Sequence, residues 1–594
     1  MKYLLGILLL ALLSGCSSSD PIAAMDNTDR SIKKEQKDVG IIPRVVVVGA
    51  GLSGLSAALE LASGGAEVTV IDMSSVYGGH AVMSQGGLAI IDTPVQKAHG
   101  QNDSADLAYQ DFIEWGEGAN REWVRYYVDH SREMIYDWLM DLGVRFSGVD
   151  TAPGNTVERF HQPDGRGIGL VTPVYRACLE HENVRFIWNT QADGLLVRNE
   201  RVTGVSTTGL RDNLTREFTA DAVVLATGGF QSNLEMVREF WPAEFQFPKR
   251  ILSGSGRHST GLGHRMAQQV GGDLVKMDYQ WNYYSGLPDP LNPESNKGLN
   301  AANMWGILVN WKGLRFANDH GWAKEVMPAL LSQQQVTCWA IFDESTKGEF
   351  TVSGSDWADA DKVNRLILEN TKLVKKADTV EELARLSGLP INNLVKTIER
   401  YNAMVRLGVD EDFGRFGPGT TEFNNTASVP LETPPFYAMQ TFPLTRKSMG
   451  GVAIDLKCRV VDKQQRPIPG LYAVGELTGL ALINGKAALE GTFLGPCVVT
   501  GRVAAQTILN RAGWESGPAI VEGQRCSDCH DIRGEIEDSR PGYWHFEKVH
   551  SKVLTEQLDC RQCHGELSPY HEETHRIDPT VLTAACMRCH TGRE

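Results

Sequence analysis

A glycine-rich turn between a β-branched strand and an Ala/Leu-rich helix constrains the fold more than any other feature. Arg44 is followed by four consecutive valines, and this stretch over residues 44–48 predicts a buried parallel strand. Residues 49–54 read GAGLSG, and a helical stretch and a second strand ending in an aspartate follow. The glycines permit a tight turn and let the backbone approach a pyrophosphate at the helix N-terminus, and the acid suits a ribose. The pattern predicts a doubly wound α/β dinucleotide-binding domain, with contacts from Gly49, Gly51, Ser53, Gly54 and Asp72.

Three copies of Cys-x-x-Cys-His lie toward the C-terminus. A lone Cys-x-x-Cys also suits a zinc knuckle or a redox pair, but three copies each followed by His favour c-type haem. The two thiols bond to the porphyrin edge and the adjacent histidine ligates the iron. The predicted attachment cysteines are Cys526, Cys529, Cys560, Cys563, Cys586 and Cys589, and the predicted proximal ligands are His530, His564 and His590.

Four other histidines in the same segment are candidates for the distal face of the haems. Three would complete bis-His ligation, which favours electron transfer over oxygen chemistry. The spacing does not pair them with particular haems. The candidates are His545, His550, His571 and His575.

The N-terminus predicts export. The apolar run over residues 4–13 is too short to span a bilayer and is typical of a signal peptide. It ends in Leu-Ser-Gly-Cys16, which resembles a bacterial lipobox, so we expect lipidation of Cys16 and the periplasmic side of the outer membrane. A signal peptide with a chance cysteine, and location at the cell surface or in the soluble periplasm, are the alternatives. The net charge of −15 argues against general binding to nucleic acid.

Segments beyond the first nucleotide motif resemble the fumarate reductase/succinate dehydrogenase flavoprotein family. They are residues 78–87, 221–230 and 470–476, and the likeness covers about residues 43 to 510. The chain is similar to soluble periplasmic flavocytochrome c fumarate reductases, which join FAD to c-type haems, usually with the haem domain first. The resemblance implies further FAD contacts from Gly79, His80, Gln85, Gly86, Gly87, Thr227, Gly228 and Glu476.

The resemblance leaves two alternatives for how His80 would contact FAD. In membrane-complex members of the family a histidine in this register is bonded covalently to FAD, whereas the soluble relatives usually have Asn there and bind FAD noncovalently. His80 therefore either bonds to FAD or packs and hydrogen-bonds at the isoalloxazine.

The resemblance also predicts the domain organisation. An inserted α+β capping domain closes over the flavin, and two amphipathic helices over residues 379–407 follow it. A small, mostly irregular or helical domain packed around haems ends the chain. The expected ranges are 1–15 (signal peptide), 16–42 (tether), 43–250 (FAD domain, first part), 251–364 (cap), 365–515 (FAD domain, second part) and 516–594 (triheme domain).

The catalytic positions depart from the fumarate reductase pattern. Ala323, with Lys324 beside it, stands where the resemblance places the proton-donating arginine, and residues 484–491 lack the arginine that clamps a carboxylate. A dicarboxylate needs paired guanidinium forks, so fumarate is not the expected substrate. The remaining candidates for holding the substrate or moving a proton are Arg446, Lys447, Lys486, Tyr283 and Tyr284.

The sequence thus predicts an FAD- and haem c-dependent oxidoreductase that reduces an activated alkene. Its expected partners are a small-molecule substrate, a quinol-linked or periplasmic cytochrome electron partner, and the membrane through a lipid anchor only. Two alternatives stay open. One is a dehydrogenase that passes substrate electrons out through the haems, since 3-ketosteroid dehydrogenases share the flavin scaffold. The other is an electron-transfer module without a substrate of its own.

Overall fold

The computed structural model describes residues 42–509. The predicted lipid anchor Cys16 and every predicted haem ligand lie outside the described residues. None of the helices between residues 42 and 509 is long and apolar enough to cross a membrane.

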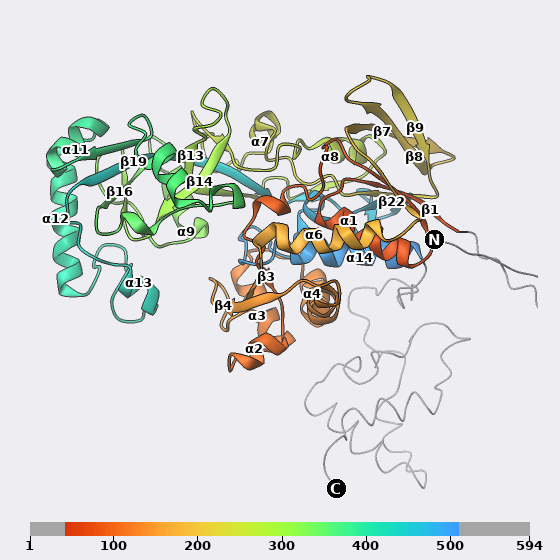
Figure 1. Ribbon diagram of the computed structural model, residues 1–594, viewed down its shortest axis with the longest axis horizontal. Coiled ribbons are helices and arrows are strands. Elements are labelled where there is room, and N and C mark those ends of the chain that lie inside the picture. The colour runs from red at the N-terminus through yellow and green to blue at the C-terminus, as the bar shows by residue number, and fades with distance from the viewer. Residues whose placement is uncertain (1–41, 510–594) are drawn as a thin grey trace, which may run out of the picture. The chain divides into compact units, whose positions relative to one another are not determined.

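The FAD domain is built on a six-stranded sheet in the order β21-β22-β10-β1-β2-β6. Figure 1 labels two of its strands, β1 and β22. Strand β1 pairs in parallel with β2 and β10, as the apolar runs predict. Helices α1, α6 and α14 cover one face, where Val45 and Val47 point, and the three-stranded sheet β7-β8-β9 and helix α8 cover the other. The bounds are β1 Arg44–Val48, α1 Leu52–Ser63, β2 Glu67–Ile71, α6 Arg166–Leu179, β6 Val184–Ile187, β7 Thr190–Arg198, β8 Arg201–Gly209, β9 Thr215–Thr219, β10 Ala222–Leu225, α8 Leu262–Gln269, β21 Arg459–Val461, β22 Pro467–Ala473 and α14 Gly495–Ile508.

The cap is a second sheet, whose longest strand is β19. Its main path runs β15-β16-β19-β13-β14-β17, and β11 and β18 also pair with β19. The bounds are β11 Leu252–Ser253, β13 Gln280–Pro288, β14 Gly298–Asn303, β15 Ile307–Asn310, β16 Cys338–Asp343, β17 Phe350–Val352, β18 Val374–Ala377 and β19 Phe436–Ser448.

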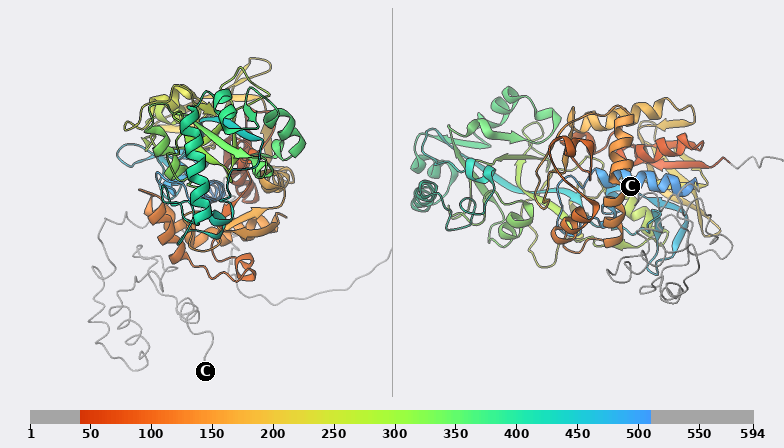
Figure 2. Two further views of the ribbon diagram at one scale, coloured as in Figure 1. Left: turned by 90° about the vertical axis from the view of Figure 1, so that its left-hand side faces the viewer. Right: turned by 90° about the horizontal axis from the view of Figure 1, so that it is seen from below.

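The cap sheet continues past residue 364, where the sequence placed the boundary of the capping domain. Strands β18 and β19 belong to it, and the two helices predicted over residues 379–407 pack on it rather than on the FAD domain. Both helices are confirmed, α11 as Val380–Ser387 and α12 as Ile391–Leu407, and the left view of Figure 2 shows α12 in front of the sheet. Amphipathic periodicity identifies a helix but not the sheet that its apolar side covers.

A buried ion-pair cluster ties the small sheet β3-β5-β4 to helix α3. These elements are β3 Leu88–Ala89, α3 Ala105–Trp115, β4 Phe146–Asp150 and β5 Phe160–Pro163. Arg159, next to β5, is fully buried and pairs with Asp103, at 2.7 Å, and with Asp111 of α3. Because a buried guanidinium needs its charge matched, this cluster fixes the loop between β4 and β5.

Candidate functional site

One cavity of about 540 Å³ collects the residues that the nucleotide motifs predicted. It begins at the β1–α1 turn, follows the loop after β2, and ends beneath the cap. All of the predicted FAD contacts except Gly54 line it. Gly54 supports the turn instead, since a Cβ there would lie 1.9 Å from the carbonyl oxygen of Gly49.

The turn at the start of α1 fits a bound pyrophosphate. Gly51 lines the cavity, and a Cβ on it would have no protein atom within 4 Å, so a ligand can approach the backbone there. No side chain caps α1 and its first turn carries no acid, which leaves its N-terminal amides for an anion. The Thr227 hydroxyl, also in the cavity wall, is buried without a hydrogen-bond partner among the described residues.

Asp72 is held in place at the nucleotide end of the cavity. Its two carboxylate oxygens accept hydrogen bonds of 2.6 Å each from the backbone N–H groups of Ala50 and Ser74. Burial raises the pKa of Asp72, and those two hydrogen bonds oppose the rise. The fixed carboxylate suits the hydroxyl groups of a ribose, and together with the open turn it makes the residues fit FAD.

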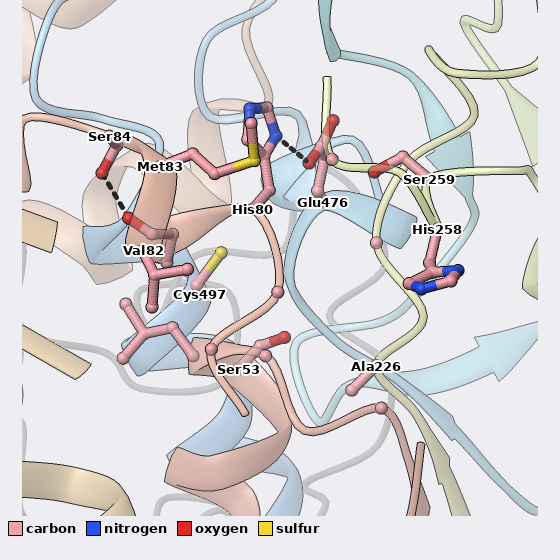
Figure 3. Close-up of a pocket in the computed structure, with 18 of the residues that line it drawn as sticks. Ser53, His80, Val82, Met83, Ser84, Ala226, His258, Ser259, Glu476 and Cys497 are labelled. Atoms are coloured by element: carbon pink, nitrogen blue, oxygen red, sulfur yellow. Dashed lines mark hydrogen bonds and ion pairs between the residues drawn. The ribbon is translucent and has the colours of Figure 1, made fainter. Parts of the chain in front are cut away.

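His80 and Glu476 lie next to each other in the cavity wall, and Figure 3 marks the contact between them. The His80 Nδ1 lies 3.7 Å from a Glu476 oxygen and 3.4 Å from the Ser255 hydroxyl, and Glu476 also accepts a 2.9 Å hydrogen bond from the Ser448 N–H. Burial lowers the pKa of His80, which favours the neutral ring. Burial opposes ionisation of Glu476, but the interactions with His80, the Ser448 N–H and the charge of Lys447 together outweigh it, and the pKa of Glu476 is lowered.

The end of β19 delivers two cations to the cap side of the cavity. Arg446 donates a hydrogen bond to the carbonyl oxygen of Gly254, and the Lys447 Nζ lies 3.0 Å from the ring centroid of Phe493. Burial lowers the pKa of Lys447 to about 7, although the negative charge of Glu490 opposes this shift. Lys447 can therefore give or take a proton near neutral pH.

Of the other predicted catalytic residues, one lines the cavity and the rest lie outside its lining. Tyr283 lines the cavity, and burial raises the pKa of its hydroxyl. Tyr284 points the other way from the same strand and packs in the cap core. Lys486 lies outside the cavity lining and pairs at 2.6 Å with Glu244, and Lys324 pairs at 3.2 Å with Glu117.

Some residues of the site were not predicted. The sequence analysis considered Glu490 only as part of residues 484–491, the segment that lacks an arginine. In the structure its charge acts on Lys447, Arg446 and Tyr283. The only signal for it was an acid close to Gly491 in a segment already assigned to the flavin region. Other cavity-lining side chains without a sequence signal are Asn300, Ser353 and Cys497.

Comparison with known proteins supports the assignment of this cavity to FAD. Residues 44–494 match the family described as FAD binding domain. A fumarate reductase (cytochrome) of Shewanella frigidimarina is 30% identical over 78% of this chain and 76% of its own length. A KsdD-like steroid dehydrogenase of Mycobacterium tuberculosis is 30% identical over 81% of this chain and 99% of its own length.

A solved structure shows the same fold. The open conformation of a flavocytochrome c3 fumarate reductase matches with a TM-score of 0.65 and 28% identity, over 79% of this chain and 78% of that one. The fold and the cavity therefore define a flavoprotein. The chain belongs to the FAD binding domain family, and it is an FAD-dependent oxidoreductase of the fumarate reductase/succinate dehydrogenase group.

Proposed function

We propose that this chain is an exported flavocytochrome c that reduces an activated alkene other than fumarate, with electrons that arrive through three c-type haems. The haem part is supported by the three Cys-x-x-Cys-His motifs, and export by the apolar run over residues 4–13 that predicts a signal peptide and by the lipobox-like Cys16. FAD, when bound, supplies hydride transfer and exchanges electrons singly or in pairs.

The charge on the cap side of the cavity carries the proposal about the substrate. Arg446 supplies one guanidinium, Lys447 a group that is half neutral near pH 7, and Glu490 an opposing negative charge. The cavity lining holds a second guanidinium, that of Arg257, but it belongs to the nucleotide end. Its neighbour His258 is close enough to Asp72 for the charge of that carboxylate to oppose the lowering of the His258 pKa by burial. One guanidinium facing a carboxylate suits a substrate with a single carboxylate or carbonyl, and not a dicarboxylate.

The proton is assigned to Lys447. It lines the same cavity as His80 and Glu476, on the side that the cap closes, and its pKa of about 7 matches the pH at which a general acid is most useful. Arg446 would orient the anionic or carbonyl end of the substrate, and Tyr283 would close the wall beside it.

One observation favours the reverse reaction as a second candidate. A lysine that is half deprotonated near neutral pH is also a competent base, so it could take the proton from a saturated substrate. The identity with a KsdD-like steroid dehydrogenase over nearly the whole of that protein supports this candidate.

A single titration separates the candidates. Protein reduced with dithionite is mixed with a panel of mono-acid enoates, enones and fumarate, and haem and flavin absorbance are followed. Reoxidation by a mono-acid or neutral compound supports the reductase, whereas reoxidation by fumarate alone overturns the proposed substrate class. Haem reduction in oxidised protein on adding a saturated ketone or acid supports the dehydrogenase, and no response to any compound favours the electron-transfer module.

A further inference from the structure

An apolar face on the outside of the FAD domain lies directly over the FAD cavity. Ile168, Tyr175 and Leu179 recur at helical spacing along one flank of α6, about a quarter turn from its buried residues, and Ile168 and Leu179 are 47% and 57% exposed. Val76, in the loop after β2, is 64% exposed. We call this surface the α6 face, made of Val76, Tyr77, Ile168, Tyr175, Leu179 and Trp188.

The α6 face is continuous with the wall of the cavity. Val76 and Tyr77 line the cavity, and the Tyr77 ring stacks on Tyr175 with centroids 4.0 Å apart, while its hydroxyl lies 3.0 Å from that of Thr172. The first turn of α6 abuts the loop that carries His80, since a Cβ on Gly167 would lie 2.1 Å from the Ala81 oxygen. A redox group seated on this face would thus be separated from the cavity by a single layer of side chains.

The described chain ends beside the same helix. Leu509 packs over Gly64 at the end of α1, where a Cβ would lie 2.2 Å from the Leu509 side chain. The neighbouring Ser63 hydroxyl is 3.3 Å from His181, two residues beyond the end of α6, and Figure 1 shows α1, α6 and α14 together. The first haem motif begins 17 residues after Leu509. That length spans up to roughly 60 Å when extended, whereas the 14 residues of α6 span about 21 Å.

We propose that the α6 face is the docking surface for residues 510–594 of the same chain, so that a haem lies next to the FAD cavity. Large apolar side chains gathered on one face mark interaction sites more than isolated ones do. Residues 510–594 carry 15 acidic against 10 basic side chains, and Arg166 and Arg176 of α6 make no ion pair among residues 42–509. The proposal rests on the proposed function for the haems. Two haems each lose one electron for every FAD that takes up two electrons and two protons.

Site-specific photocross-linking in the full-length chain tests the docking without needing a substrate. The cross-linker p-benzoylphenylalanine replaces Ile168 in one variant and Leu386 of α11 in a control, because both positions are 47% exposed. We expect peptides from residues 510–594 to be joined to position 168 and not to position 386. Cross-links from 168 to a second copy of the chain, equal yields at both positions, or no cross-link would overturn the proposal.

Haem content measured on the same sample tests the proposed function separately. Protein with haem but no cross-link refutes only the docking, and cross-linked protein without haem refutes only the haem chemistry.

Electron transfer gives a second readout. The variant Ile168→Glu places a carboxylate in the proposed contact, so flavin reduction after the haems receive electrons from substoichiometric dithionite should slow by about tenfold or more in stopped-flow absorbance. The matched Leu386→Glu change should leave that rate unchanged. Leu179→Glu serves if Ile168→Glu folds poorly, as judged by its FAD content. Wild-type rates in the folded α6 variants would overturn the docking.

Discussion

The Lys447 Nζ lies 3.0 Å from the centroid of the Phe493 ring, inside the cavity that fits FAD. The aromatic face attracts the ammonium form, while burial favours the neutral amine. Burial prevails, and the pKa of this partly buried lysine lies at about 7.

The pH dependence of turnover should follow Lys447. Because the acid form predominates below a pKa of about 7, reduction of the alkene should slow as pH rises through 7, and oxidation of the saturated product should speed up. Lys447→Met should lower kcat by about 10²-fold or more and remove this dependence. Steady-state rates from pH 5.5 to 9, with the compound found in the panel, check it. An unaltered profile in the Met variant would exclude Lys447 as the proton carrier.

Glu490→Gln should shift the pH profile of alkene reduction toward lower pH. The Glu490 charge raises the pKa of Lys447, so its removal should lower this pKa, and the pH at which alkene reduction falls should decrease. Glu244→Gln is the matched control, because Glu244 pairs with Lys486 outside the cavity lining. A profile that stays in place, or moves to higher pH, would contradict the electrostatic arrangement.

Gly51→Ala should weaken FAD binding with little effect on the fold. Its new methyl group would enter space in which no protein atom lies within 4 Å, at the turn that a pyrophosphate approaches. We expect at least about tenfold weaker binding of FAD to the apoprotein by fluorescence titration. Gly348→Ala also places a methyl group in open space, on the cap surface, and should bind FAD normally. Equal affinities in the two variants would argue against the turn as the pyrophosphate site.

Arg159→Met should strongly destabilise the FAD domain. It leaves the carboxylates of Asp103 and Asp111 buried without a cation, which costs about 3–5 kcal/mol in the free energy of unfolding. Arg400→Met breaks a pair with Asp412 in which the arginine is 55% exposed and screened by solvent, and should change the free energy of unfolding far less than Arg159→Met. Urea unfolding followed by flavin and tryptophan fluorescence compares them. A small loss at Arg159 would show that the two acids are stabilised in another way.

Replacing Cys560 and Cys563 together by alanine should remove one haem and leave the FAD content unchanged. The motif supplies both thioether bonds of a single haem, and two other motifs remain. The ratio of haem to FAD, from the pyridine haemochrome and the released flavin, should fall from three to two. If the ratio did not change, the motif would not be a haem site.

The sequence alone determined the nucleotide-binding half of the cavity. The motif from β1 to Asp72 is local, so the chemistry of each residue follows from its place in one strand, turn and helix. The two helices after residue 379 were equally readable, because Thr379 caps α11 and both have one apolar side.

Only the tertiary structure decided the substrate side. Tyr283 and Tyr284 are neighbours in sequence, but strand alternation sends one to the cavity and the other to the cap core. Lys447 and Glu490 are separated by three strands, β20 (Gly451–Val452), β21 and β22, and by several turns. Their charges interact only because β19 runs from the cap into the FAD domain. Periodicity along a chain specifies the faces of its elements, whereas the meeting of distant side chains and their shifted pKa values depend on how those faces pack and exclude water.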